Sequence, residues 1–186
     1  SAIERAAESL PSDPGVTDQV VVIVNAPSAF VSVYGPLIQA MKGRPVPQRS
    51  ITLGSGIYPN TVTRPEPNAL NLRPEGGFQA PPGSPQPGQE ASQRAFDLRY
   101  FQQTVDYLYR DATPLHAGER IAYGGTTAEV IEVTDGGRPV EVSFRFDVIL
   151  EDPSLVWLRW DDGVYAPFAL PQVGESTVLP AVTVPW

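Results

Sequence analysis

The sequence has no cysteine, and histidine and lysine occur once each among its 186 residues. The lack of cysteine excludes disulfides, zinc–thiolate sites, iron–sulfur clusters and cysteine nucleophiles. A Ser-His-Asp site would have to use His116, but no G-x-S-x-G turn accompanies it. A zinc site would need three carboxylates beside that one histidine. We therefore expect no metal, no cofactor and no catalytic residue, with His116 facing solvent or capping a turn.

Long apolar runs and clustered cations are also missing. No stretch approaches the roughly 18–20 apolar residues that span a bilayer, and the start shows no signal-sequence pattern. The formal net charge is −8 and the arginines are scattered, which argues against nucleic acid or an anionic membrane surface as partner. The chain begins at Ser1 rather than Met, so we expect an upstream portion to have been removed. The expected partner is another protein or the remainder of the same chain, without direct membrane insertion by this segment.

Glycine and proline are abundant instead, with 16 Gly and 21 Pro. They concentrate in residues 74–93 (PEGGFQAPPGSPQPGQEASQ), which hold few apolar side chains. Such a stretch cannot offset the entropy that it loses on ordering, so it is predicted to be a loop or linker. A Pro-rich ligand segment of the PxxP kind is the alternative. This segment divides the chain into a predicted α/β unit, residues 1–73, and a second unit, residues 94–186.

The first unit is predicted to contain a strand–helix–strand motif. Residues 19–24 (QVVVIV) form a continuous apolar run, which is typical of a strand covered on both faces. A helix follows, with Gly43 placed to end it and Gly35-Pro36 expected to kink or split it. Its apolar positions at helical spacing are Phe30, Val33, Tyr34, Leu37, Ile38 and Met41. The other predicted elements are a helix over 2–10, a strand over 49–53, and a hairpin of strands 60–64 and 69–73.

The second unit is predicted to be built around one alternating strand. Residues 140–148 place apolar side chains at even positions and polar or charged side chains at odd ones, so the strand has one apolar and one charged face. The charged face consists of Glu141, Ser143, Arg145 and Asp147. A helix is predicted over 94–110, and five short strands over 118–123, 126–134, 140–150, 155–160 and 164–168. The predicted fold class is α+β, with these five antiparallel strands forming an SH3-like or OB-like barrel.

Two polar residues follow the first strand at a place where α/β proteins often bind ligands. Ligands sit beyond the carboxyl ends of strands, where a helix N-terminus offers free N–H groups. Asn25 and Ser28 are therefore the candidate residues of a small-ligand-binding or hydrolase-like module. The competing interpretation is that either one only caps the helix. The acid pairs Glu151-Asp152 and Asp161-Asp162 are interpreted as turn residues rather than as calcium or glycosidase sites.

Aromatic residues gather around one predicted hairpin and form the candidate interaction surface. They are Trp157, Trp160, Tyr165 and Phe168. Because Trp157 and Trp160 have opposite parity, both faces of their strand are apolar. One face can close the core, and the other must be covered by the N-terminal half, a partner or a ligand. Large aromatic residues dominate binding hot spots, which favours a protein-interaction surface. The alternative is a carbohydrate-binding module, which would need exposed, coplanar Trp rings.

Residues 144–160 (FRFDVILEDPSLVWLRW) resemble a segment of uncharacterised bacterial polytopic membrane proteins, and so do residues 163–168 (GVYAPF) with 173–175. Residues 20–27 and 70–74 are similar in a looser way. In those proteins a soluble domain follows the transmembrane helices. The resemblance implies an extracytoplasmic address and membrane tethering, and it carries over no catalytic residue. The leading expectation is therefore a non-catalytic extracytoplasmic interaction domain of a larger membrane-associated protein.

Overall fold

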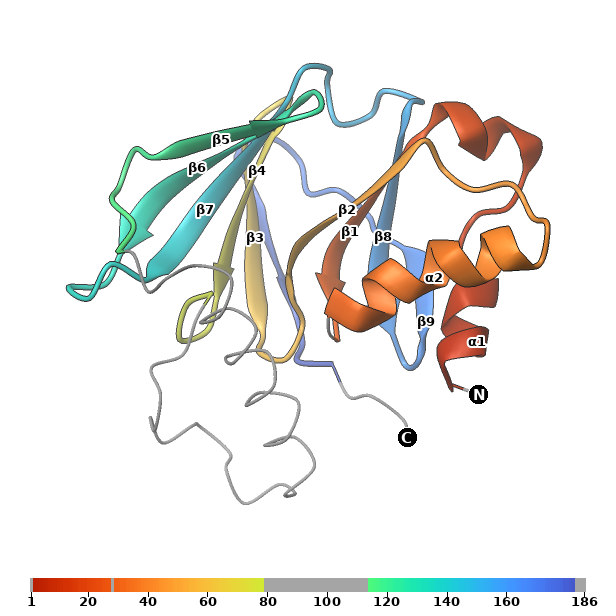
Figure 1. Ribbon diagram of the computed structural model, residues 1–186. Coiled ribbons are helices and arrows are strands. Elements are labelled where there is room, and N and C mark those ends of the chain that lie inside the picture. The colour runs from red at the N-terminus through yellow and green to blue at the C-terminus, as the bar shows by residue number, and fades with distance from the viewer. Residues whose placement is uncertain (1, 28, 79–113, 183–186) are drawn as a thin grey trace.

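The computed structural model describes residues 2–27, 29–78 and 114–182, which form two β-sheets with helices on the outer side of one of them (Figure 1). The mixed α+β class is confirmed, with strands predominating. No closed barrel is found among the described residues, because the predicted barrel strands are shared between two open sheets. The predicted helix over 94–110 and most of the predicted linker lie outside the described residues.

The first sheet has the strand order β2-β1-β8-β9. Its members are β1 (Val20–Ala26), β2 (Arg49–Ser55), β8 (Leu155–Asp161) and β9 (Val164–Pro167). The central strand β1 is buried along its whole length and pairs in parallel with both β2 and β8. The β8–β9 hairpin turns at Asp162 and Gly163, with φ angles of 43° and 86°. A two-residue hairpin turn of this kind requires positive φ at both positions, which explains the Asp-Asp-Gly sequence.

The helices are α1 (Ala2–Glu8), the short 3-10 helix η1 (Pro14–Asp18) and α2 (Ala29–Met41). Helix α2 connects the parallel strands β1 and β2, so the predicted βαβ motif is present. It runs through Pro36 as one helix and does not split there. Within the described part of the chain, no helix is both long and apolar enough to cross a membrane.

The second sheet is antiparallel and has the order β10-β3-β4-β7-β6-β5. Its members are β3 (Asn60–Glu66), β4 (Ala69–Pro74), β5 (Arg120–Tyr123), β6 (Thr126–Val133), β7 (Pro139–Phe146) and β10 (Ser176–Leu179). The predicted hairpin of residues 60–73 is β3–β4, and β4 pairs with the alternating strand β7. Both sheets therefore combine strands from the predicted units 1–73 and 94–186.

Two groups of apolar side chains fill the interior on either side of the first sheet. Between the sheets, Val22 and Val24 of β1 lie in one cluster with Leu70 and Phe146. On the helix side, Ile23 lies in a second cluster with residues of α1, β8 and β9. Alternate side chains of one strand thus enter different clusters, because they point to opposite faces. This placement accounts for the unbroken apolar run of β1.

The charged face predicted for β7 lies on the outer side of the second sheet. Arg145 binds both carboxylate oxygens of Glu66 on β3, at 2.5 and 3.0 Å. Glu141 contacts Arg73 of β4 at 3.3 Å. Both pairs are partly exposed, so they balance charge between strands of this sheet where solvent reaches them. The opposite face of β7 contributes Val142 and Phe146 to the buried residues, as the alternation predicts.

Candidate functional site

Asn25 lies near the carboxyl end of β1 and is buried, with 1% of its surface exposed. Its Oδ1 accepts a hydrogen bond from the backbone N–H of Trp160 on β8, at 3.0 Å. Gly56 and Val182 contact each other next to Asn25, because the N–H of Val182 donates to the carbonyl of Gly56 at 2.7 Å. A Cβ on Gly56 would lie 2.8 Å from a Val182 methyl group, so no space separates them. Asn25 thus joins β1 to β8, and its side chain is buried rather than exposed to solvent.

The predicted ligand site is only partly described, because Ser28 lies outside the described residues. For Asn25 the structure shows one polar contact, made by its side-chain oxygen. Its Oδ1 bonds to the neighbouring strand β8, and the ligand-site and capping hypotheses for Asn25 and Ser28 stay predictions. A buried backbone N–H left without a partner costs about 1–3 kcal/mol, which explains an asparagine at this position.

All four aromatic residues of the predicted interaction surface are buried. Trp157 packs edge-on against Phe146, at 5.2 Å between ring centroids, and its indole nitrogen donates to the carbonyl of Leu150 at 2.7 Å. Trp160 packs in the same way on Tyr165, also at 5.2 Å. The two faces of β8 are covered by the sheets and helices of this chain, so these side chains form core rather than surface. Trp157 and Trp160 also offer no exposed ring on which a sugar could stack.

Burial changes the acidity of Tyr165. Loss of contact with water disfavours the phenolate and raises the pKa of Tyr165 to about 12, while the side chain of Ser32 acts in the opposite direction. The backbone N–H of Tyr165 donates to the hydroxyl of Ser9 at 2.7 Å. Tyr165 therefore connects β9 to the residue that follows α1 and stays protonated at neutral pH.

The acidic pair Glu151-Asp152 belongs to the loop between β7 and β8, and each carboxylate has a structural partner. Arg64 of β3 binds Glu151 through two nitrogens, at 2.5 and 2.7 Å, and this contact is the main reason that the pKa of Glu151 is lowered. Asp152 accepts hydrogen bonds from the hydroxyl and N–H of Ser154, which lower its pKa. Both carboxylates organise the loop, as the turn interpretation predicts.

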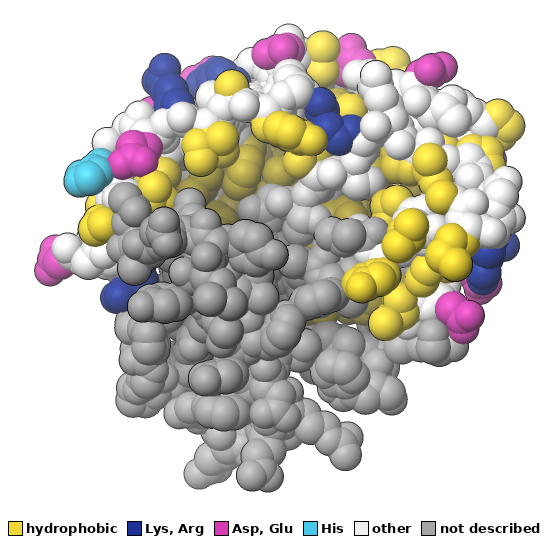
Figure 2. Space-filling model, viewed as in Figure 1, with side chains coloured by type: hydrophobic (Ala, Val, Ile, Leu, Met, Phe, Trp, Pro, Cys, Tyr) yellow, Lys and Arg dark blue, Asp and Glu magenta, His cyan; other side chains and the backbone are white. Residues whose placement is uncertain are grey.

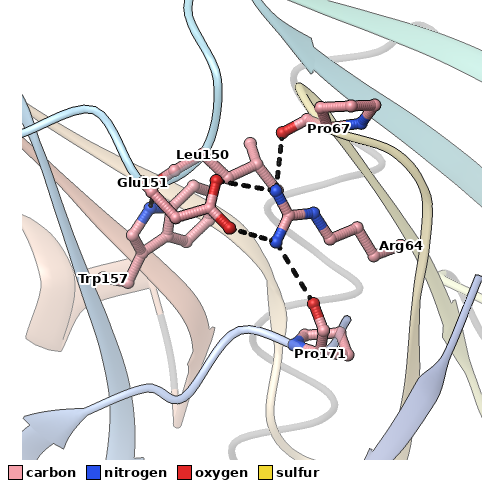
Figure 3. Close-up of polar contacts among 6 residues, drawn as sticks. All are labelled: Arg64, Pro67, Leu150, Glu151, Trp157 and Pro171. Atoms are coloured by element: carbon pink, nitrogen blue, oxygen red, sulfur yellow. Dashed lines mark hydrogen bonds and ion pairs between the residues drawn. The ribbon is translucent and has the colours of Figure 1, made fainter. Parts of the chain in front are cut away.

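Arg64 is the most buried cation of the described structure, with 5% of its side chain exposed. Figure 3 shows its guanidinium group between Glu151 and the backbone carbonyls of Pro67 and Pro171. The two carbonyl contacts measure 2.8 and 3.3 Å. Arg64 thus ties the β3–β4 hairpin to the β7–β8 loop and to the segment before β10. The role is structural cross-linking.

His116 lies in an exposed turn, and its Nδ1 is 2.7 Å from Glu119 Oε1. The same oxygen accepts a hydrogen bond from the His116 backbone N–H at 2.8 Å. This arrangement agrees with a turn residue facing solvent. Across the described ranges, no three His, Asp or Glu residues lie close enough together to hold a metal ion.

A shallow groove of about 540 Å³ opens beside the ends of β3, β4, β7 and β10. Its cationic side chain, Arg73, contacts both Glu132 and Glu141. The charge of the arginine is therefore already balanced within the chain. The groove does not present it to an anionic ligand.

The described side chains in the second half of α2 place a polar residue inside and apolar residues outside. Its inner side approaches the end of α1 through Gly35, where a Cβ would lie 2.7 Å from a Leu10 methyl carbon. Gln39, also buried, donates through Nε2 to the carbonyl of Leu10 at 3.0 Å. The outer side carries Tyr34, Leu37 and Met41, which are 44, 49 and 80% exposed. We call these three residues the α2 stripe.

The α2 stripe has the spacing i, i+3, i+7 of side chains on one helix face. Sequence periodicity located the helix correctly, but such a face normally packs on the core. The sequence signal that could have indicated this orientation is the lack of charge. Residues 29–41 contain no acidic or basic residue, so no charged face marks the side of the helix that meets solvent. Figure 2 shows hydrophobic side chains gathered over the position of α2.

Comparison with known proteins finds no matching family model, no matching curated protein and no matching solved structure. Three features are candidates: the buried Asn25, the Arg64 cross-link and the α2 stripe. The first two are satisfied within the chain, and the α2 stripe faces solvent.

Proposed function

We propose that this chain is a non-catalytic protein-interaction domain and that the α2 stripe is its contact surface. The observation that carries the proposal is the exposure of Tyr34, Leu37 and Met41 on a helix without charged residues. Contiguous apolar groups on a protein surface mark interaction sites, whereas single exposed apolar residues are common. This surface replaces the aromatic hairpin, whose side chains pack inside the protein.

Burial of the α2 stripe would supply favourable free energy that the isolated chain does not gain. Covering one Leu or Met side chain contributes roughly 1.5–3 kcal/mol. No charged group on the helix would have to lose its hydration in the process, so the desolvation cost is small. The spacing i, i+3, i+7 is also that of the anchor residues by which helices enter apolar grooves.

The proposed setting is extracytoplasmic, in a larger membrane-associated protein. This part of the proposal rests on the resemblance of residues 144–160 to the soluble domains of polytopic membrane proteins. The acidic charge of the chain, −8, supports a protein partner rather than an anionic lipid surface. The carbohydrate-binding alternative has no support in the buried Trp157 and Trp160.

Site-specific photo-crosslinking in the cells that make the protein tests this proposal. A photoreactive amino acid at position 37 should give a discrete covalent adduct, because Leu37 lies in the middle of the α2 stripe. The matched control is position 178, where Val178 of β10 is 64% exposed but far from α2 in the sheet order. Equal adduct formation from both positions, or none from position 37, would exclude the α2 stripe as the contact.

A further inference from the structure

We propose that the segment after β10 occupies a binding site for apolar peptide segments, and that a partner's peptide enters this site when the segment leaves it. The site lies where Val182 meets Gly56, beside the carboxyl ends of the parallel strands β1 and β2 (Figure 1). In open α/β sheets, ligands bind at this edge. The inference goes beyond the proposed function, because it concerns a surface other than the α2 stripe.

Val182 makes both kinds of contact by which proteins bind peptides. Its backbone N–H donates to the carbonyl of Gly56 at 2.7 Å. Its side chain packs against the helix-side cluster, to which Ala26 of β1 belongs. A main-chain hydrogen bond gives affinity for any peptide, and a place for one side chain gives preference. We call Gly56 and the part of the cluster that Val182 covers the Gly56 seat.

Gly56 makes this close contact possible. A Cβ at this position would lie 2.8 and 3.0 Å from two methyl carbons of Val182. Gly56 is not among the glycines with positive φ, so space rather than backbone conformation explains a glycine here. The seat also keeps its shape without Val182, because the N–H of Gly56 donates to the carbonyl of Ala26 at 2.7 Å. It is therefore a formed site that the segment occupies.

The segment after β10 is held by few contacts. Pro180 and Ala181 are exposed, Val182 is partly buried, and all three follow the end of β10 at Leu179. Ordering each residue costs conformational entropy, which one hydrogen bond and one partly buried side chain offset only in part. Val182 should therefore leave the seat more readily than the paired strands separate. The open seat then accepts another peptide with a side chain of the size of valine.

Fluorescence anisotropy with a labelled peptide of residues 179–186 tests the inference on the full chain. In the unchanged chain, Val182 competes with the peptide for the seat. The variant Val182→Asp places a charge against an apolar cluster, so its own segment should leave the seat. The peptide should then bind about ten-fold more tightly, which corresponds to the contribution of one valine side chain.

Two outcomes of this experiment would overturn the inference. One is a folded Val182→Asp variant that binds the peptide no more tightly than the unchanged chain does. The other is a Val182→Asp variant that does not fold, because Val182 would then be a fixed part of the core rather than a displaceable occupant. Thermal unfolding followed by circular dichroism distinguishes the two.

Three controls assign the binding to the Gly56 seat. Val178→Asp introduces the same charge at an exposed position of β10 and should leave peptide binding unchanged. Gly56→Ala, added to the Val182→Asp chain, should abolish the gain, because its Cβ takes the space of the valine methyl groups. A peptide that itself carries Val182→Asp should not bind. Equal binding of the two peptides would contradict a specific site.

Amide hydrogen exchange in the unchanged chain measures whether the seat opens. The N–H of Val182 should exchange through local opening, at a rate that low urea concentrations do not change. The N–H of Val22, in the buried central strand β1, should exchange through unfolding and respond to urea. The same urea dependence at both positions would contradict a displaceable segment.

Discussion

At the scale of single residues, Arg64 and Arg145 make the same contact in different surroundings. Each binds both oxygens of a glutamate, but 5% of the Arg64 side chain and 48% of the Arg145 side chain are exposed. Water and salt screen an exposed pair, so it adds little to stability. The Glu151 side chain is 55% exposed, so the difference lies in the buried guanidinium of Arg64, whose loss leaves two backbone carbonyls without a donor.

The first prediction compares alanine substitutions at these two positions. Arg64→Ala leaves the Pro67 and Pro171 carbonyls without their donor and should lower the free energy of unfolding by about 2–4 kcal/mol. Arg145→Ala should shift the urea midpoint far less. Urea denaturation monitored by Trp fluorescence measures both. Equal decreases in the free energy of unfolding would show that burial does not determine how much the Arg64 contact stabilises the protein.

The second prediction concerns Tyr165 at high pH. Its folded-state pKa of about 12 lies above the ordinary value of 10.0, so unfolded chains lose this proton first. The corresponding stability is fully present below pH 10 and is lost as pH rises from 10 to 12, in total on the order of 2–3 kcal/mol. In the variant Tyr165→Phe, this part of the decrease in the free energy of unfolding at alkaline pH should be absent. Urea denaturation at several pH values between 9 and 12 measures it, and identical slopes in both proteins would contradict the assignment.

At the scale of elements, α2 shows what periodicity can and cannot predict. Spacing alone located a helix ending at Met41, but it does not tell which side is covered. That depends on the residues that follow α1, because Leu10 fills the space beside Gly35 and its carbonyl accepts a hydrogen bond from Gln39. The contact joins residues 29 positions apart in sequence, and nothing local encodes it. The stripe was therefore assigned to a helix without its exposure being foreseen.

The third prediction tests this orientation of α2. Leu37→Ser should change the free energy of unfolding by no more than about 0.5 kcal/mol, because Leu37 is half exposed. Gln39→Ala should cost about 1–3 kcal/mol, because it leaves the Leu10 carbonyl without its donor. In a conventional amphipathic helix the order of the two effects would be reversed. Chemical denaturation of the two variants decides between these arrangements.

At the scale of the whole molecule, the strands were predicted better than the way in which they assemble. Alternation along β7 and the Asp-Asp-Gly turn of β8–β9 are local signals, and both are confirmed. The parallel pairing of β1 with β8 joins Val20 to Leu155, and no local pattern marks it. Predicting a separate barrel therefore missed that β8 and β9 extend the N-terminal sheet. The same pairing buries Asn25 and the predicted aromatic surface.

The fourth prediction follows from this mixed topology. Residues 1–78 and 114–186, produced separately, should each fail to fold, because each sheet needs strands from both. Far-UV circular dichroism and amide chemical-shift dispersion report the outcome for each piece. A cooperatively folded piece would instead support independent units on the two sides of the predicted linker.

The central claim is that α2 is covered when the protein works, and thiol labelling measures this coverage most directly. The variants Met41→Cys and Val178→Cys each place one thiol in a chain without cysteine, at positions that are 80% and 64% exposed. The labelling rate of position 41 is divided by that of position 178, which cancels differences in reagent access. We predict that this ratio falls several-fold in the cells that make the protein, relative to the purified chain at low concentration. A ratio that is the same in both settings would contradict the account.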